Sequence, residues 1–260
     1  MYTAGGIKYA SAGQGPALVC LHGIGGDSES FRPQLDELSD NYRVFSWNIP
    51  GYGGSEALEE VSFTSLCRAL LGFLDELQLN DVVLVGQSIG GMIAQEFALR
   101  HAERVAALVL VATTSAFGGR DDSFREAFLK ARLKPLDEGH TLAELAPRFV
   151  PEILGSAATE EALRAAVASM SRVPEQNYRD ILKCLVTFNR WQEVASIRQP
   201  VCLIAGAQDN NAPAKTMQKM AEKMAAARFR IVPGAGHLVN LECPRETNQI
   251  IREFLSEELQ

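Results

Sequence analysis

Short apolar runs recur along the chain, and segments with helical spacing of apolar residues separate them. The runs remain apolar at successive positions instead of alternating with polar residues. That pattern is typical of strands buried on both faces, as in a parallel sheet covered by helices. The six predicted strands span Ala17–Gly23, Tyr42–Gly51, Val82–Ser88, Val105–Ala112, Val201–Asp209 and Arg228–Gly236.

The segments between these strands place apolar residues three or four positions apart, which predicts helices that pack one face on the sheet. The clearest are Ser62–Leu79, Gly90–His101, Ala214–Ala227 and Pro244–Leu259. Alternating strands and helices build βαβ units. The pattern therefore predicts an α/β fold with a mostly parallel, doubly wound sheet.

One long region interrupts the alternation. From Phe117 to Arg190 the chain has helix-spaced patches punctuated by charged residues and prolines, and it contains no convincing buried strand. We predict that residues 117–190 form a helical cap inserted into a core made of residues 1–116 and 191–260. The alternative is a pair of ordinary crossover helices with long loops, but loops of that length are unusual inside a domain.

The composition narrows the class of protein. The 260 residues are 47% hydrophobic and carry a net charge of −7, which allows a large core and offers no basic surface for nucleic acid. The most apolar run, Val105–Ala112, is too short to span a membrane. The five cysteines are widely spaced and the first residues do not resemble a signal peptide. We therefore expect a cytoplasmic protein without disulfides or a cysteine metal site.

The stretch Gly86-Gln87-Ser88-Ile89-Gly90 follows a predicted strand and precedes a predicted helix. A sharp turn of this kind exposes the serine and needs small residues on both sides, because backbone segments approach closely there. The first N–H groups of the helix would also face an anion formed at the serine. The bare pattern arises by chance in other chains, and its strand–turn–helix context is what favours Ser88 as a nucleophile.

A serine hydroxyl needs a base to accept its proton, and the base needs a group that orients it. His237 follows the last predicted strand between small residues, and Asp209 ends the strand before it. The carboxyl ends of parallel strands share one edge of the sheet, so we expect Ser88, Asp209 and His237 to meet there as a catalytic triad. A packed loop histidine and a turn-forming aspartate are the structural alternatives.

The oxyanion of a tetrahedral intermediate needs hydrogen-bond donors. We assign the backbone N–H groups of Ile89, just after the nucleophile, and of Ile24, in the glycine-rich loop after the first predicted strand. His22 stands at the start of that loop. We expect it to hold the loop by hydrogen bonding and not to carry protons.

Five segments, HGIGG, NIPGYGGS, GQSIGG, GAQDNNAP and GAGHLVNLECP, occur in an order and spacing that resembles the α/β-hydrolase superfamily. Within it the chain resembles the group of 3-oxoadipate enol-lactonases and meta-cleavage-product hydrolases. The resemblance implies a lid built by the insertion, serine chemistry on a small-molecule substrate, and no cofactor or metal. The chain departs from it at Asn48, where relatives often carry aspartate, and we expect a structural role there.

We therefore predict a serine hydrolase that cleaves a small-molecule ester or lactone through an acyl-enzyme. One alternative is a carbon–carbon bond hydrolase of the meta-cleavage-product type, in which Arg190 is a candidate to bind a substrate carboxylate. Another is a small-molecule receptor of the same fold with low turnover. The expected pocket residues are Met170, Phe188, Arg190 and Trp191, whose spacing suits plain packing equally well. Neither the substrate nor the oligomeric state follows from the sequence.

Overall fold

The computed structural model describes residues 1–118, 122–225 and 227–259. Its centre is an eight-stranded sheet in the order β1-β2-β4-β3-β5-β6-β7-β8. Strands β3 to β8 are parallel to one another, whereas β2 is antiparallel to both β1 and β4. The bounds are β1 (Tyr2–Ala4), β2 (Ile7–Ala12), β3 (Ala17–Leu21), β4 (Arg43–Trp47), β5 (Val82–Gln87), β6 (Val105–Val111), β7 (Val201–Gly206) and β8 (Ala227–Val232).

The sequence pattern predicted six of these strands and missed the first two. β1 and β2 pair across a turn at Gly5 and Gly6, which both have positive φ. Only Ala4 of β1 is buried, and β2 ends in two half-buried residues. These strands therefore lack the continuous apolar run that marks the buried strands.

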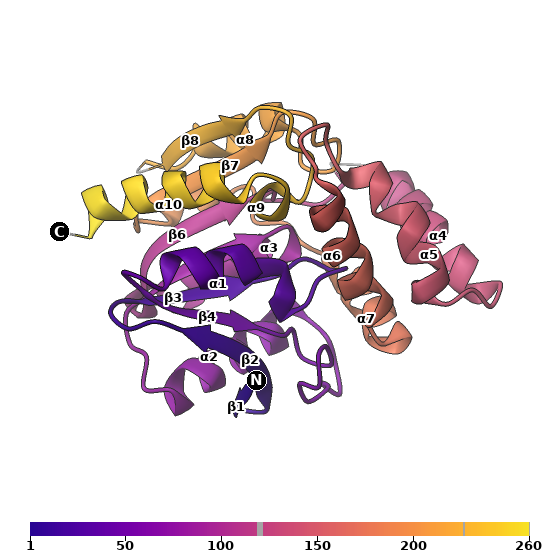
Figure 1. The fold of residues 1–260 in the computed structure, drawn as a ribbon, viewed down its shortest axis with the longest axis horizontal. Coiled ribbons are helices and arrows are strands. Elements are labelled where there is room, and N and C mark those ends of the chain that lie inside the picture. The colour runs from indigo at the N-terminus through magenta and orange to yellow at the C-terminus, as the bar shows by residue number, and fades with distance from the viewer. Residues whose placement is uncertain (119–121, 226, 260) are drawn as a thin grey trace.

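Helices cover both faces of the sheet, as Figure 1 shows. α1 and α10 share one apolar core with Leu18 and Cys20 of β3, whereas α2, α3 and α8 share another with Val19 and Leu21. Because both faces are covered, every residue of β5 and β7 is buried, which explains the uninterrupted apolar runs. The bounds are α1 (Arg32–Leu38), α2 (Phe63–Glu76), α3 (Ile89–Arg100), α8 (Ala214–Ala221), α9 (Val239–Glu242) and α10 (Pro244–Glu258).

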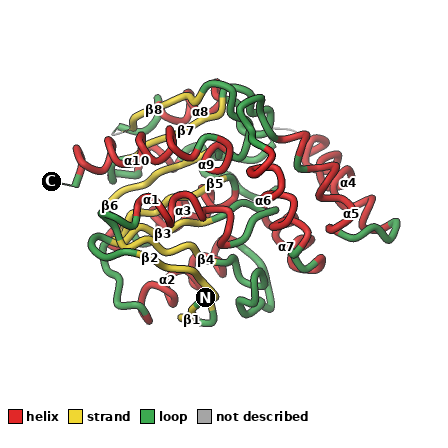
Figure 2. Tube along the Cα trace, viewed as in Figure 1, coloured by secondary structure: helices red, strands yellow, loops and turns green. Residues whose placement is uncertain are grey.

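The described part of the region between β6 and β7 is helical. Its helices are α4 (Asp122–Asp137), α5 (Leu142–Phe149), α6 (Glu160–Ser171) and α7 (Glu175–Leu185). Figures 1 and 2 show them gathered at one end of the sheet, away from both chain termini. The two ends of this segment lie side by side where they join the core. The Phe117 N–H donates to Phe188 O (2.8 Å), and the Arg190 N–H donates to Ser115 O (2.7 Å).

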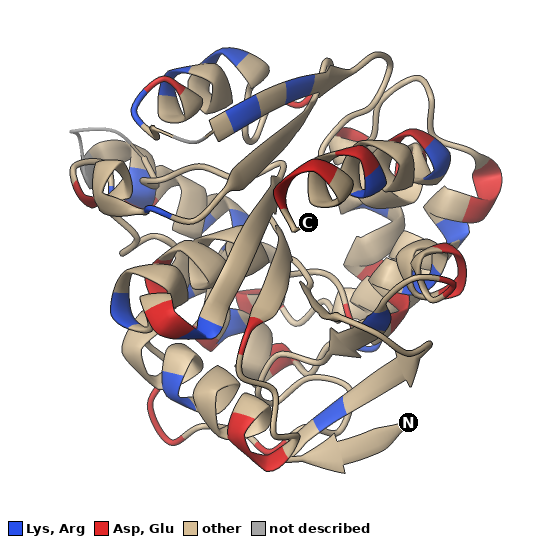
Figure 3. Ribbon diagram, turned by 90° about the vertical axis from the view of Figure 1, so that its left-hand side faces the viewer, with Lys and Arg blue, Asp and Glu red and all other residues tan. Residues whose placement is uncertain are grey.

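The remaining surface and the cysteines add little chemistry. Acidic and basic positions are interspersed along the outer helices and loops (Figure 3). All five cysteines are unpaired, and burial raises the pKa of the Cys20 and Cys67 thiols well above the usual value.

Among the described residues, no helix combines the length and the apolar character that crossing a membrane requires.

Candidate active site

Ser88 occupies a sharp turn between β5 and α3. Its backbone lies at φ 54° and ψ −121°, a conformation that costs a residue with a side chain about 1–3 kcal/mol. A Cβ added at Gly86 would lie 2.4 Å from Gly90 O, and one added at Gly90 would lie 2.0 Å from Leu21 O. Glycine is therefore required at both positions, and the turn presents the Ser88 side chain at the edge of the sheet.

Three side chains from distant parts of the chain meet at this edge. His237 stands in the loop after β8 and Asp209 in the loop after β7. His237 Nε2 lies 3.0 Å from Ser88 Oγ, and His237 Nδ1 lies 2.8 Å from Asp209 Oδ2. The hydroxyl, imidazole and carboxylate thus form one continuous chain of hydrogen bonds.

The Asp209 carboxylate is buried, and its surroundings favour the charged form. Burial alone would raise its pKa, but the hydrogen bond and charge of His237 and two backbone N–H groups together lower it below the usual value. Those N–H groups belong to Asn211 and Ala212, which donate to Asp209 Oδ1 at 2.7 and 3.1 Å. An ionised Asp209 accepts a hydrogen bond from the His237 Nδ1–H, which keeps that proton on Nδ1 and leaves Nε2 free to accept a proton from Ser88.

A buried glutamate holds the loop that carries His237. The Glu242 carboxylate accepts hydrogen bonds from the N–H groups of Gly236 and Leu238, on either side of His237, each at 2.9 Å. It also accepts one from the Gly155 N–H at 2.6 Å, which ties the loop to the segment between α5 and α6. The sequence reasoning missed Glu242, because an acidic residue in a short helix gives no signal that it is buried.

Residues 23–27 belong to the loop after β3, which we term the glycine loop. His22 holds its first residue: Nδ1 lies 2.7 Å from Gly23 O and Nε2 lies 3.0 Å from the Ile49 nitrogen. Burial lowers the pKa of His22 to about 4, so the imidazole is neutral and donates from Nδ1 while Nε2 accepts. This arrangement confirms the expected structural role of His22.

Of the two predicted oxyanion donors, Ile89 directly follows Ser88 in the chain, and Ile24 lines the same cavity as Ser88. Ile89 is the first residue of α3, whose opening N–H groups have no acceptor within the helix. Ile24 belongs to the glycine loop, in which a Cβ added at Gly23 would lie 3.3 Å from Ser88 Cβ. The loop therefore passes close to Ser88.

Asn48 holds the backbone directly after the glycine loop. Its Oδ1 accepts from the Ser28 N–H at 2.8 Å, and its Nδ2 donates to Lys8 O at 3.1 Å. The side chain is fully buried, so it holds backbone and does not face a substrate. The structural role expected for this position is confirmed.

A cavity of about 700 Å³ opens onto Ser88 and His237. Its walls come from the loops after β6 and β7 and from α4, α5 and α7. Most of the lining is apolar or neutral, and Arg132 of α4 is the only described lining residue with a permanent charge. Its guanidinium carbon lies 4.9 Å from the ring centre of Phe149 and 5.8 Å from that of Phe128.

Arg132 makes no ion pair with any carboxylate in the described part of the chain. Its charge also acts on Tyr178, another lining residue. Burial raises the pKa of Tyr178, and the positive charge of Arg132 lowers it by a smaller amount. The described His, Cys, Asp and Glu residues form no cluster of three or more that would hold a metal. Among its described lining residues, the cavity therefore offers one permanent cation to a ligand and no carboxylate.

Met170 lines the cavity as predicted, but the other three expected pocket residues do not. Phe188 is buried against Phe63, with ring centres 4.6 Å apart. The sequence reasoning instead missed Arg132 and Tyr178, which α4 and α7 direct toward the cavity.

Arg190 and Trp191 lie on the core side of the segment. Arg190 donates to both carboxylate oxygens of the buried Glu96, at 2.5 and 3.0 Å, and the Trp191 ring lies 4.3 Å from Lys223 Nζ. α7 ends at Leu185, so helical spacing does not extend to these positions and the chain there has returned to the core. The predictions that Phe188, Arg190 and Trp191 line the pocket are therefore wrong.

Residues 16–244 match the family model described as the alpha/beta hydrolase fold, so the chain belongs to that family. It is 31% identical to a Bacillus subtilis protein provisionally named 2-succinyl-6-hydroxy-2,4-cyclohexadiene-1-carboxylate synthase, over 96% of each chain. It is 27% identical to the 2-hydroxy-6-oxo-2,4-heptadienoate hydrolase of Pseudomonas putida, over 99% of this chain and 96% of the relative.

Solved structures show the same fold. An esterase from Thermogutta terrifontis superposes with a TM-score of 0.87 at 22% identity, covering 96% of this chain and 93% of the esterase. The enol-lactonase from Burkholderia xenovorans superposes with a TM-score of 0.84 at 23% identity, over 96% of both chains. The predicted fold class and the resemblance to enol-lactonases and meta-cleavage-product hydrolases are thus confirmed.

Proposed function

We propose that the protein is a serine hydrolase that cleaves a small-molecule ester or lactone through an acyl-enzyme. The observation that carries the proposal is the hydrogen-bonded chain from Ser88 through His237 to the ionised Asp209. The esterase and the enol-lactonase that share the fold support this reaction class. The helices α4 to α7 act as a cap that closes the large cavity over the reacting atoms.

In the first half of the reaction, Ser88 Oγ attacks the carbonyl carbon while His237 Nε2 takes the hydroxyl proton. The Ile24 and Ile89 N–H groups bind the oxyanion. Asp209 holds the tautomer and stabilises the imidazolium. His237 then protonates the leaving alcohol, which departs with the bonding electron pair, and Ser88 keeps the acyl group.

In the second half, His237 removes a proton from water, and the resulting hydroxide attacks the acyl-enzyme. Ser88 regains its proton from His237 as the acid leaves. The net reaction consumes one water and yields one acid and one alcohol, or a hydroxy acid from a lactone, with no cofactor.

The proposal is tested with Ser88→Ala and a simple aryl ester such as 4-nitrophenyl acetate. We expect the variant to lose about 10⁴-fold or more in kcat while its thermal unfolding stays close to wild type. Ser171→Ala makes the same change on α6 outside both the triad and the large cavity, and should keep full activity. Full turnover by Ser88→Ala would exclude Ser88 as the nucleophile.

A second candidate is cleavage of a carbon–carbon bond in a substrate that bears a carboxylate. Arg132 is the observation that favours it, because a cation without a carboxylate partner among the described lining residues suits an anionic group. The Pseudomonas putida relative is named as the hydrolase of such an acid. In this reaction His237 would assist conversion of the enol to the keto form before the bond breaks.

Three substrates separate the candidates: an aryl ester, an enol-lactone and a dienoate diketone. Preference for the first two supports the ester or lactone hydrolase, and preference for the third supports carbon–carbon cleavage. A low-turnover receptor would react once with a fluorophosphonate at Ser88 but would turn over none of the three repeatedly.

A further inference from the structure

A second, smaller chamber meets the large cavity at Ser88. It holds about 70 Å³, against about 700 Å³ for the large cavity. An acyl carbon attached to Ser88 would therefore face two spaces of very different size. The residues that line both are Ile24, Gly25, Ser88, Ile153, Met170 and His237.

Much of the wall of the small chamber is apolar. Ala166 and Met170 reach it from α6, whereas Leu238 and Leu241 reach it from the loop after β8 and from α9. Its described lining contains no Asp, Glu, Lys or Arg. It therefore suits an apolar group.

The two amide side chains in the wall already use their N–H donors. Gln87 Nε2 donates to His237 O at 2.9 Å, and Asn240 Nδ2 donates to Ser30 O at 2.8 Å. These bonds join the loop after β8 to the end of β5 and to the segment after the glycine loop. The two amide side chains are thus held in place within the chamber wall.

The chamber has room for very few atoms. An apolar cavity of about 150 Å³ holds one benzene ring, so a chamber of about 70 Å³ has room for a group of two or three heavy atoms. We infer that the small chamber is a subsite for one of the two groups attached to the substrate carbonyl, and that it accepts only groups of about methyl to ethyl size. This inference rests on the proposed esterase function and specifies its substrate class: esters with one small side.

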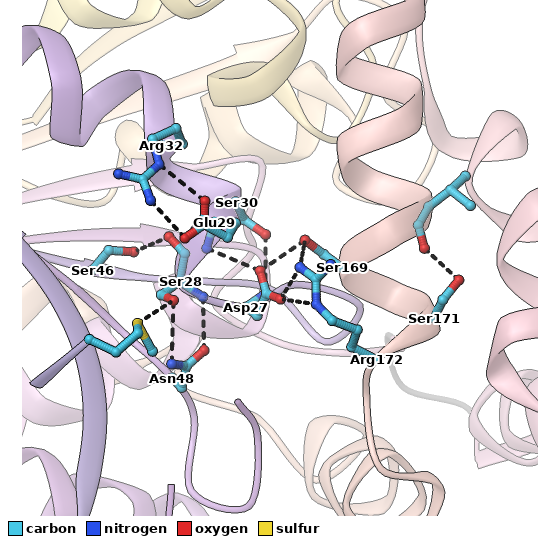
Figure 4. A network of polar contacts seen from close by, with 12 residues as sticks. Asp27, Ser28, Glu29, Ser30, Arg32, Ser46, Asn48, Ser169, Ser171 and Arg172 are labelled. Atoms are coloured by element: carbon cyan, nitrogen blue, oxygen red, sulfur yellow. Dashed lines mark hydrogen bonds and ion pairs between the residues drawn. The ribbon is translucent and has the colours of Figure 1, made fainter. Parts of the chain in front are cut away.

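Asp27 joins the glycine loop to α6 beside the chamber. It ends the glycine loop, and its carboxylate accepts a hydrogen bond from Ser169 Oγ at 2.8 Å and pairs with Arg172 Nη2 at 2.5 Å (Figure 4). Ser169 precedes Met170, whose side chain forms part of the wall. α6 is therefore bonded to the glycine loop beside the chamber, and the chamber cannot widen without breaking these bonds.

Three isomeric esters test the subsite: methyl heptanoate, hexyl acetate and butyl butanoate. They have the same atoms and similar hydrophobicity, but only butyl butanoate has a bulky group on both sides of the carbonyl. We expect its kcat/KM to be at least about tenfold below that of the better of the other two, the range that misfit of a methylene or more produces in an apolar pocket. A faster hexyl acetate would assign the chamber to the acyl group, and a faster methyl heptanoate to the alcohol.

Leu241→Ala enlarges the chamber by three carbon atoms and should bring butyl butanoate to within about threefold of the better isomer. The control is Leu77→Ala, which removes the same atoms at the end of α2, outside both cavities, and should leave the ratio unchanged. Ala166→Leu fills the chamber and should slow all three esters. Thermal unfolding of each variant shows whether it remains folded.

Two results would overturn the subsite while leaving the proposed function intact. One is equal turnover of the three isomers by the wild-type protein, and the other is a Leu241→Ala variant that changes all three rates by the same factor. By contrast, the absence of Ser88-dependent turnover of any ester would overturn the proposed function together with the subsite.

Discussion

The core and the cap bring their residues to the site in different ways. Ser88, Asp209 and His237 stand shortly beyond parallel strands, so the topology of the sheet alone places them at one edge. Arg132 and Tyr178 stand on α4 and α7, where their direction depends on how those helices pack. We therefore expect the core to set the rate of reaction on every substrate, and the cap to set which substrates are preferred.

The largest effect should come from the core. Asp209→Asn replaces the carboxylate that lies 2.8 Å from His237 Nδ1 by an amide. The amide favours the tautomer of His237 that cannot accept a proton from Ser88. We expect kcat to fall by about 10⁴-fold for charged and neutral esters alike, with KM little changed. Asp27→Asn, the same change at the cap contact, serves as the control. A loss confined to one substrate, or smaller than about tenfold, would contradict a general role for Asp209.

A smaller and selective effect should come from the cap. Arg132→Gln removes the one permanent cation in the described lining of the large cavity, so we expect KM for monomethyl adipate to rise by about 10- to 100-fold while methyl hexanoate is barely affected. Arg190→Gln is the contrasting variant, because Arg190 pairs with Glu96 outside the cavity. It should lower thermal stability without changing the preference for the carboxylate. If both arginine variants lost that preference equally, Arg132 would not be the recognition site.

The same comparison explains what the sequence could predict. The meeting of Ser88, Asp209 and His237 was predictable because each follows an apolar run, and the order of strands in a parallel sheet then fixes where they come together. Gly86 and Gly90 added a local signal, since the close approaches at both positions exclude any side chain.

The cavity walls were less predictable. Helical spacing identifies which residues share a helix face, but it does not say whether that face meets the sheet, the solvent or a cavity. Phe188 and Arg190 were grouped with the cap for this reason, although they contact Phe63 and Glu96 of the core. The prolines of this region suggested interruptions between the helical patches, yet Pro135 lies inside α4.

We expect a stability effect of intermediate size from His22, whose imidazole bonds to the first residue of the glycine loop. Its pKa is about 4 in the folded protein because burial disfavours the charged form, against about 6.5 when unfolded. Between these values the unfolded chain binds more protons, so the free energy of unfolding falls as the pH drops below 6.5. At pH 5 the loss relative to pH 7 should be about 2 kcal/mol from this residue.

Urea unfolding at pH 7 and pH 5 measures this loss. His22→Gln cannot titrate, so the fall in its unfolding free energy over the same interval should be smaller by about 2 kcal/mol. Each protein is compared with itself at the two pH values, which removes the cost of losing the hydrogen bonds of His22. Equal losses in the two proteins would mean that His22 does not resist protonation in the fold.

The smallest effect should come from the contact that joins the cap to the core. Asp27→Asn keeps an acceptor for Ser169 but weakens the pairing with Arg172, whose side chain is 54% exposed. Exposed pairs contribute about 0–1 kcal/mol, so we expect little loss of stability and about a two- to threefold gain in the relative rate of butyl butanoate. Arg172→Gln should give the same gain, and the double variant should give no more than either single variant, because both remove one contact. Gains that multiplied in the double variant would show that the two residues act separately, and the cap would then not be coupled to the glycine loop through this pair.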